Sequence, residues 1–421
     1  MSEENCDVLI VGGGPTGLLL AALLARRGGD VLVLERRTAP AEHSRAIGLH
    51  PPALAALRDV GLERAAVEAG APIRCGRARS RGRELGEVRF ARAWPGRPFV
   101  LALPQSRTEA LLADRLAAVA PDALRRGWEV TGLRELGGGV EVTARRADGN
   151  GADEQPGDQA THATGNSTMA ATVAATHEEA AVFRARVVVG ADGARSTVRD
   201  LLGIDTTGVE HRDTYLMGDL ADPDGAGEDR DAIIHLEPGG VVESFPLPGA
   251  RRRWVVHSGR AGLPRRSPEL LTALIQQRTG TRLDPTTTSM ISPFTVRRRT
   301  ARRLLTERCV LLGDAAHEVS PIGGQGITLG WLDVLDVAPL LQRAASDPRP
   351  LPEQAAWRRL ARRWRRRTLV AGLLGHANTA LGRPLPAPLA GLRTVAVGIA
   401  LRTPLRHLMA WTYSMGWGLR I

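Results

Sequence analysis

The chain has 421 residues, of which 43% are hydrophobic and 24% are charged, a composition typical of soluble globular proteins with sizeable cores. The formal net charge is +11, and all 56 residues counted as lysine or arginine are arginine. The absence of lysine excludes enzymes that need a Schiff-base lysine or a phosphate-loop lysine.

The cysteines and the first residues of the chain indicate its compartment. Cys6, Cys75 and Cys309 have no metal-binding or redox spacing, so we expect reduced thiols and no metal site. The first residues, MSEEN, are acidic where a signal peptide would be basic. The best uncharged stretch, residues 368–382, is too short to cross a bilayer. We therefore predict a cytoplasmic protein without a transmembrane helix.

Residues 6–35 are expected to form a strand, a glycine turn, a helix and a second strand. Gly12, Gly14 and Gly17 follow the first apolar strand in the pattern G-x-G-x-x-G, and Glu35 ends the second strand. The glycines allow a tight turn, a close approach of backbone to a pyrophosphate and close helix packing, while the acid accepts hydrogen bonds from ribose hydroxyls. This unit predicts an adenine dinucleotide.

Two further strand–turn units and an alternating region follow along the chain. Residues 184–203 and 307–317 each contain a continuous apolar strand that runs into a turn, as is typical of a parallel sheet covered by helices. Residues 213–258 alternate polar and apolar positions between Gly/Pro turns, which predicts an antiparallel sheet in a second domain. Residues 148–181 are rich in Ala, Thr and Gly without periodicity, so we predict a flexible insertion there.

The stretch GDAAHEVSPIGGQGITLG, residues 313–330, contains five glycines between an apolar strand and an expected helix. Glycine is favoured where the backbone turns sharply or lies against a ligand with no Cβ in between. The free N–H groups at a helix start favour negative charge. We therefore expect this backbone to lie against a large, partly anionic ligand.

The region from residue 345 onward is predicted to be helical and rich in arginine. The run RRLARRWRRR, residues 358–367, has the charge density of a nucleic-acid-binding segment. Leu360, Trp364 and Thr368 fall on one stripe of a helix, however, which favours a structural helix with a solvated arginine face. We therefore predict no nucleic-acid partner.

The last residues of the chain leave two alternatives open. Residues 401–421 mix arginines with Trp411, Tyr413 and Trp417, a composition found in segments that lie on a membrane surface. The alternative is that these residues cover the cofactor-binding domain. We keep a peripheral membrane contact through this tail as one expectation.

Several of these stretches resemble motifs of a known family. GADGARSTVR, residues 190–199, and GDAAHEVSPIGGQG, residues 313–326, are similar to the two later signatures of the FAD-dependent aromatic hydroxylases. This is the p-hydroxybenzoate hydroxylase family, which also contains polyketide and ubiquinone-pathway hydroxylases. SRAIGLHPPALAALRDVGL, residues 44–62, and LPQSRTEALLADRLA, residues 103–117, resemble the family as well. The resemblance covers about residues 5–345.

The expected elements and the resemblance together predict an α/β fold. A Rossmann-like FAD-binding domain with a parallel sheet is interleaved with a substrate domain built on an antiparallel sheet, and a helical C-terminal tail follows. The predicted boundaries are 1–74, 100–204 and 296–344 for the FAD-binding domain, 75–99 and 205–295 for the substrate domain, and 345–421 for the helical region.

The resemblance also implies which residues hold FAD and which lie nearest the reaction. The implied cofactor-binding residues are Gly12, Gly14, Pro15, Thr16 and Gly17 at the pyrophosphate, Glu35 and Arg36 at the adenosine ribose, Arg45 and Gln105 at the middle of FAD, Asp192 at FAD and nicotinamide, Gly313 and Asp314 at the ribityl chain, and Pro321, Gly324, Gln325, Gly326, Ile327 and Thr328 beside the isoalloxazine ring. Among these, Arg45 and Pro321 are the predicted catalytic residues.

Two residues depart from the family pattern, and one histidine needs an assignment. The family usually has Asn where this chain has Thr328, and often a proline where it has Ser320. Because backbone contacts survive such changes, flavin binding is expected to persist. His317 belongs to the ribityl turn in the family, so we interpret it as structural. Met217, His235, Phe245 and His257 are candidates for the far wall of the substrate pocket.

The family's chemistry is what the resemblance implies for this chain. It would be an FAD- and NAD(P)H-dependent monooxygenase that hydroxylates a small aromatic or polycyclic, polyketide-like substrate with O2 through a flavin C4a-hydroperoxide. The alternatives are a flavin epoxidase, a ring-rearranging monooxygenase, or a flavin-binding accessory protein without turnover. Either a monomer or a homodimer is expected.

Overall fold

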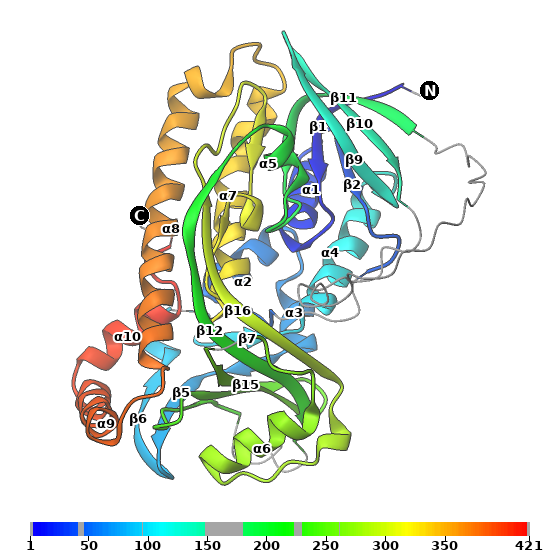
Figure 1. The fold of residues 1–421 in the computed structure, drawn as a ribbon. Coiled ribbons are helices and arrows are strands. Elements are labelled where there is room, and N and C mark those ends of the chain that lie inside the picture. Colours follow the sequence, from blue (N-terminus) through cyan, green and yellow to red (C-terminus); the bar gives the residue numbers. More distant parts are fainter. Residues whose placement is uncertain are drawn as a thin grey trace, which may run out of the picture.

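Two large sheets built from different kinds of strand organise the fold (Figure 1). The computed structural model describes residues 3–40, 46–94, 96–147, 180–222, 230–260 and 262–418. In the first, seven-stranded sheet the strand order is β8-β2-β1-β11-β10-β9, and β17 pairs with β11. Its strands are β1 (Glu3–Val11), β2 (Val31–Glu35), β8 (Leu124–Arg126), β9 (Trp128–Leu136), β10 (Gly139–Arg146), β11 (Ala180–Gly190) and β17 (Cys309–Leu311).

The pairs β1–β2, β1–β11, β2–β8 and β11–β17 are parallel, which confirms the predicted parallel sheet. The pairs β9–β10 and β10–β11 are antiparallel and extend the same sheet at one edge. Parallel strands are buried on both faces, and this accounts for the continuous apolar runs in the sequence. Ala180 and Ala181, which we assigned to the flexible insertion, begin β11, while residues 148–179 lie outside the described residues.

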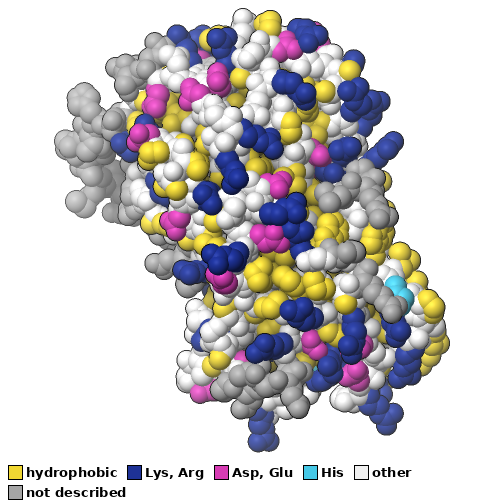
Figure 2. Space-filling model, turned by 180° about the vertical axis from the view of Figure 1, so that it is seen from behind, with side chains coloured by type: hydrophobic (Ala, Val, Ile, Leu, Met, Phe, Trp, Pro, Cys, Tyr) yellow, Lys and Arg dark blue, Asp and Glu magenta, His cyan; other side chains and the backbone are white. Residues whose placement is uncertain are grey.

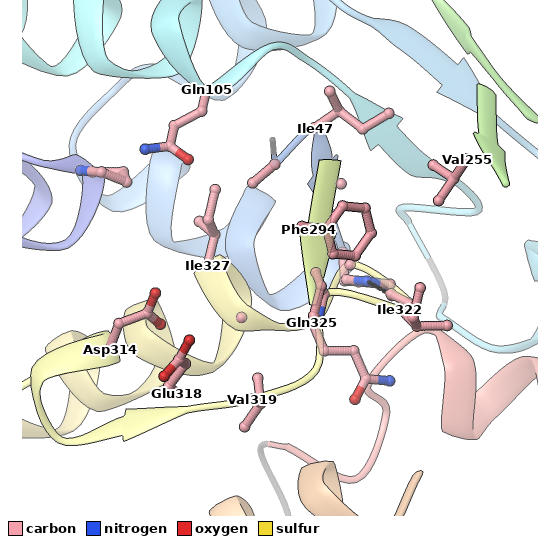
Figure 3. A pocket seen from close by; sticks show the side chains of 18 of the residues that line it. Ile47, Gln105, Val255, Phe294, Asp314, Glu318, Val319, Ile322, Gln325 and Ile327 are labelled. Carbon is pink, nitrogen blue, oxygen red and sulfur yellow. Dashed lines mark hydrogen bonds between the residues drawn. The ribbon is translucent and has the colours of Figure 1, made fainter. Parts of the chain in front are cut away.

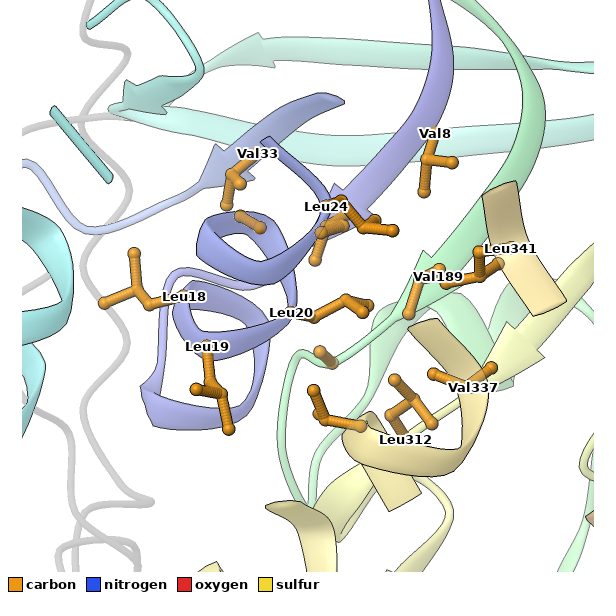
Figure 4. Packing of buried hydrophobic residues seen from close by; sticks show 14 of the residues in the cluster. Val8, Leu18, Leu19, Leu20, Leu24, Val33, Val189, Leu312, Val337 and Leu341 are labelled. Carbon is orange, nitrogen blue, oxygen red and sulfur yellow. The ribbon is translucent and has the colours of Figure 1, made fainter. Parts of the chain in front are cut away.

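Helices pack against the parallel strands. They include α1 (Pro15–Arg26), α4 (Gln105–Val119), the short α5 (Thr197–Leu201) and α7 (Gly326–Ala344). Leu20 and Leu24 of α1 belong to one buried cluster with Val189 of β11 and Val337 of α7 (Figure 4). A Cβ at Gly17 would lie 2.0 Å from the carbonyl oxygen of Gly12, so only glycine lets α1 pack this close to the first turn.

The second, eight-stranded sheet has the order β18-β16-β12-β15-β14-β13-β5-β6. Its strands are β5 (Cys75–Ser80), β6 (Arg83–Arg89), β12 (Thr206–Ala221), β13 (Ala232–His235), β14 (Val242–Leu247), β15 (Arg251–Gly259), β16 (Met290–Ala301) and β18 (His317–Glu318). All its pairs are antiparallel except β5–β13. The boundary that we placed between residues 295 and 296 falls inside β16.

The two faces of the second sheet have different neighbours. Leu216, Val242 and Val256 pack against α6 (Pro268–Thr279) in one cluster, while Met217 and Val255, each adjacent in its strand to one of these residues, belong to another. This follows from strand geometry, because successive side chains point to opposite faces. A small sheet of β3 (Gly48–Leu49), β4 (Ala71–Ile73) and β7 (Val100–Ala102) and the helices α2 (Pro51–Asp59) and α3 (Glu63–Ala69) complete this part of the chain.

The C-terminal region is helical, as predicted. It consists of α8 (Ala355–Leu381), α9 (Ala387–Arg402) and α10 (Leu405–Tyr413), and α8 runs along one side of the molecule (Figure 1). Leu360, Trp364 and Thr368 of α8 are buried, which confirms the predicted inner stripe. Seen from behind, arginine side chains are spread over the surface with acidic side chains among them (Figure 2), in keeping with the positive net charge.

The aromatic residues of the tail are buried or partly buried in the protein. Trp417 is buried and Tyr413 lines a cavity described below, so neither supports the membrane contact as we first argued it. The exposed apolar side chains of α9 are instead Leu389, Leu392, Val395 and Ile399. A membrane contact stays a prediction, and none of the helices in the described ranges is both long and apolar enough to cross a bilayer.

Candidate functional site

A cavity of about 870 Å³ connects the two sheets. It begins outside the carboxyl ends of the parallel strands, where residues Gly12, Glu35 and Asp192 follow or end β1, β2 and β11. Ligands of open parallel sheets bind at this edge because the loops there diverge. The cavity ends at the face of the eight-stranded sheet that carries Met217 and Val255.

The first glycine turn forms one end of the cavity. Gly12 has a φ of +110°, and a Cβ there would lie 2.4 Å from the carbonyl oxygen of Ala191, so this position requires glycine. A Cβ at Gly14 would meet no atom within 4 Å, because Gly14 borders open space in the cavity wall. α1 starts at Pro15 without a side-chain cap, which leaves the N–H groups of its first turn available for an anion. This cradle fits a pyrophosphate.

Glu35 is fixed at the end of β2 beside this turn. Its carboxylate accepts hydrogen bonds from Gly13 N at 2.6 Å, from Arg37 N at 2.9 Å and from Arg37 Nε at 3.1 Å. Burial raises the pKa of Glu35, but the charge of Arg37 and these donors outweigh it and hold the pKa below its usual value. The carboxylate is therefore ionised, and it keeps acceptor capacity for a ribose hydroxyl.

Gln105 lies further along the cavity, at the start of α4. Its Nε2 donates to Glu109 Oε1 at 2.7 Å, which fixes the orientation of the amide. Glu109 is 2% exposed and also lies 3.7 Å from the guanidinium of Arg37. We did not predict Glu109 as part of the site, although its position one helical turn after Gln105 could have indicated it.

Asp192 lines the cavity but uses its carboxylate to hold a turn. Oδ1 accepts from Ser196 Oγ at 2.5 Å and Oδ2 accepts from Val198 N at 3.0 Å, at the start of α5. Burial raises the pKa of Asp192 despite these donors. These two hydrogen bonds hold the turn of Asp192 and Gly193 in place, and both residues line the cavity.

Asp314 projects into the middle of the cavity after β17. The side chain is exposed to the cavity, which protein surrounds, and Glu318 lies beside it (Figure 3). Burial and the charge of Glu318 raise the pKa of Asp314 to about 6. Gly313, with a φ of +57°, packs so closely against Thr16 that a Cβ at position 313 would lie 2.9 Å from Thr16 Oγ1.

His317 lies behind the cavity wall and has a structural partner. The ring is 2% exposed, and its Nε2 is hydrogen-bonded to Asp333 of α7. Burial lowers the pKa of His317, but the charge of Asp333 outweighs burial and raises it. This position agrees with the expectation that His317 is structural.

The loop before α7 forms another part of the cavity wall. Gly323 and Gly324 have φ values of +97° and +65°, which turn the chain so that its backbone runs along the cavity. α7 begins at Gly326 and has no side-chain cap, so the N–H groups of its first turn face the ligand space. These groups would stabilise negative charge on a ligand beside them.

His50 supports this loop and was missing from the predicted site. Its Nε2 lies 3.2 Å from the carbonyl oxygen of Gly323, and burial lowers the pKa of the ring to about 4, so it is neutral. Its backbone N–H donates to Thr328 Oγ1 at 3.3 Å. His50 also makes an edge contact with the Tyr413 ring, which comes from the far end of the chain. Only the tertiary structure joins these segments.

The structure brings most of the predicted cofactor residues to one wall. Those that line the cavity are Gly12, Gly14, Pro15, Thr16, Glu35, Arg36, Gln105, Asp192, Asp314, Pro321, Gly324, Gln325, Gly326 and Ile327. Gly17, Gly313 and Thr328 lie behind this wall and shape it through packing and hydrogen bonding. Arg45, one of the two predicted catalytic residues, lies outside the described residues.

The far wall of the cavity differs in part from our expectation. Met217 and Phe245 line it, together with Val255 and Phe294 (Figure 3 labels the last two). His235 and His257 do not, and these two assignments were wrong. His235 follows Ile234 and points to the other face of the sheet, while His257 binds Asp213 at 3.1 Å beyond the cavity.

Comparisons with known proteins agree with this geometry. A family model described as FAD binding domain matches residues 5–159 and 151–349. The rifampicin monooxygenase of Streptomyces venezuelae is 34% identical over 342 residues, which is 79% of this chain and 63% of that protein. The 6-methylpretetramide 4-monooxygenase of Streptomyces rimosus is 33% identical over 341 residues, 80% of this chain and 55% of that protein.

Solved structures cover more of the chain. The anhydrotetracycline hydroxylase from Streptomyces rimosus has a TM-score of 0.73 and 27% identity, over 98% of this chain and 76% of that one. The p-nitrophenol 4-monooxygenase from Pseudomonas putida has a TM-score of 0.78 over 100% and 98% of the two chains, and at 20% identity it shows the fold alone. The chain spans between half and two thirds of the length of the two curated relatives. With its glycine cradle and continuous cavity, the chain belongs to the FAD-binding domain family.

Proposed function

We propose that this chain is an FAD- and NAD(P)H-dependent monooxygenase that hydroxylates an aromatic or polycyclic, polyketide-like substrate. The observation that carries the proposal is the single cavity that begins at a dinucleotide cradle and ends at an apolar wall. The names of the relatives specify rifampicin and 6-methylpretetramide, which supports a substrate of this class.

FAD would lie along the cavity with its adenosine end at β2 and its isoalloxazine ring beside the loop before α7. The N–H groups of α1 would bind the pyrophosphate, Glu35 and Arg36 would hold the adenosine ribose, and Asp314 would accept a hydrogen bond from the ribityl chain. The backbone from Pro321 to Ile327 would run beside the isoalloxazine ring. Bound there, FAD supplies the redox chemistry, accepting a hydride from NAD(P)H and activating O2.

The protein's own residues would stabilise charge, orient the substrate and exclude water. The first turn of α7 presents N–H groups where the reduced ring would carry negative charge, and this stabilisation needs no lysine. The substrate would lie against the apolar wall that includes Phe245 and Phe294. This wall keeps water away from the reacting atoms. Pro321 is the described member of the predicted catalytic pair, and the role of Arg45 stays a prediction.

The proposal is tested by oxidation kinetics of the FAD-loaded protein. NAD(P)H and O2 consumption are followed with a panel of polycyclic phenols and quinones, and hydrogen peroxide is measured in parallel. We expect slow oxidation without substrate and a strong acceleration by a proper substrate with little peroxide, because substrate binding would gate reduction and seal the site. Flavin that NAD(P)H never reduces, with or without these compounds, would favour the accessory protein instead.

A further inference from the structure

One row of side chains crosses the eight-stranded sheet where it faces the cavity. Met217 of β12 pairs with Val255 of β15, Val255 pairs with Glu243 of β14, and Glu243 pairs with Ile234 of β13. Residues that pair directly across strands share one face, and all four line the cavity. Three of the four are apolar, so Glu243 places a carboxyl group in the middle of an apolar wall.

The charged groups in the neighbouring rows are paired, but Glu243 is not. Arg253 binds Asp219 at 2.6 and 2.8 Å on one side, and His257 binds Asp213 at 3.1 Å on the other. Glu243 is only 9% exposed, and the described part of the chain offers its side chain no hydrogen bond or ion pair. A buried carboxyl group without a partner is costly, and such groups usually meet a ligand or a proton.

The surroundings of Glu243 favour a ligand whose hydrogen-bond donor carries no charge. Burial raises the pKa of Glu243 to about 7. The pKa values of Tyr215 and Tyr413 are raised first by their own burial and then by the charge of Glu243. Tyr413 lines the cavity and stacks on Phe90 with ring centres 5.8 Å apart. The ionisable groups in the two adjacent rows of β12 and β15 are Tyr215, Asp219, Arg253 and His257; Asp213 is bound to His257, and Tyr413 comes from the tail. The cationic side chains among them are bound to Asp213 and Asp219.

We propose that Glu243 sets the substrate class by accepting a hydrogen bond from a hydroxyl group on the ring system, so that the cavity selects neutral hydroxyarenes over aryl carboxylates and ethers. The inference rests on the proposed function and names the substrate for that same cavity. A hydrogen bond to a carboxylate is stronger than one between neutral groups. A substrate carboxylate at the same position would place two like charges together in an apolar wall, while an ether would leave Glu243 without a donor.

The test compares three bicyclic probes that differ only in one substituent at the same ring position: naphthol, methoxynaphthalene and naphthoate. Dissociation constants are measured on the FAD-loaded protein at about pH 8, above the pKa of about 7 of Glu243, so that its carboxyl group is mostly ionised. The change in flavin absorbance reports binding. The wild type is expected to bind naphthol roughly tenfold or more tightly than either analogue, as expected for a hydrogen bond to a charged acceptor. A wild type that binds the three probes equally, or none of them, overturns the proposal.

Two substitutions separate a hydrogen bond from packing. Glu243→Leu should bring naphthol to the affinity of methoxynaphthalene, while Glu243→Gln should strengthen naphthoate because its amide can donate to a carboxylate. Glu269→Gln, on the exposed first turn of α6, is the control and should leave all three constants unchanged. Unchanged selectivity in both Glu243 variants, with FAD still bound, overturns the role of Glu243 alone. Hydroxyl selectivity without any oxygenation of bound substrates overturns the proposed function instead.

Discussion

The backbone N–H of Gly13 donates to the carboxylate of Glu35 at 2.6 Å and so joins the first glycine turn to the end of β2. The same carboxylate is bound by the backbone and side chain of Arg37. Glu35 therefore has two tasks: it stabilises the turn that would cradle the pyrophosphate, and it keeps a charged acceptor at the position of the ribose.

Replacing Glu35 should affect both tasks. We expect Glu35→Ala to weaken FAD binding by about 1.5 to 3 kcal/mol, because a hydrogen bond to a charged acceptor is lost. It should also lower the Tm of the FAD-free protein, because Gly13 N–H and Arg37 lose their acceptor. Glu68→Ala, at an exposed position of α3, is the control for both measurements. An unchanged FAD dissociation constant would remove Glu35 from the cofactor site.

Gly14 separates ligand binding from folding. Because a Cβ at this position meets no atom within 4 Å, both Gly14→Ala and Gly14→Asp should fold with wild-type Tm in the absence of FAD. Gly14→Asp should be purified without flavin, since its carboxylate would lie against the pyrophosphate. The alanine variant should retain flavin, as judged by absorbance. A yellow Gly14→Asp protein with full FAD content would mean that the pyrophosphate lies elsewhere.

The cofactor side of the cavity could be predicted from the sequence because local patterns encode it. Gly12 and Gly14 follow an apolar strand and open a helix, and Asp314 follows another such strand, so short motifs fix both backbone and position. The far wall could not be predicted in this way. Alternation in 213–258 does not say which face is inward, and whether a position such as His257 lies within or beyond the cavity depends on its place along the strand.

Residues from remote segments were missed for the same physical reason. His50 and Tyr413 meet although they are far apart in the sequence, and no local pattern connects them. Glu243 stands out only once the register with Val255 and Ile234 is known, since a lone acid in an alternating strand is an ordinary solvent-facing residue. Glu109 is the exception, because helical spacing from Gln105 could have indicated it.

Asp314 should link pH, stability and FAD binding. Its pKa is raised from 3.8 to about 6, so the folded FAD-free protein binds this proton more tightly than the unfolded chain. The wild type therefore loses stability as pH rises from 3.8 to about 6 and keeps that loss above 6. Asp314→Asn lacks this loss. Its Tm without FAD should match the wild type below that window and exceed it above.

FAD binding by the same variant should change in the opposite direction. Above pH 6 the wild type offers an ionised acceptor to the ribityl chain, and Asp314→Asn should bind FAD more weakly there. Isothermal titration at pH values on both sides of the window measures the effect. A Tm difference that does not vary with pH would contradict the assigned protonation, and equal FAD affinities above the window would remove Asp314 from the cofactor site.

His317 should behave as a structural residue. His317→Ala leaves Asp333 buried without its hydrogen-bond partner, and removing one member of a buried pair typically costs about 3 to 5 kcal/mol of unfolding free energy. Urea unfolding of the FAD-free protein measures this loss. An unfolding free energy equal to that of the wild type would show that the pair does not support the loop before α7.

The central claim is that one cavity brings FAD and an aromatic substrate together for transfer of oxygen. It is tested most directly by turnover under labelled dioxygen, with a hydroxyarene that accelerates NAD(P)H oxidation, followed by the mass spectrum of the product. The account predicts a product that carries one labelled oxygen atom, in an amount that matches the NAD(P)H consumed. Rapid reduction of bound FAD with electrons passed to an acceptor other than oxygen, and no label in the product, would contradict it and leave a dehydrogenase on this fold.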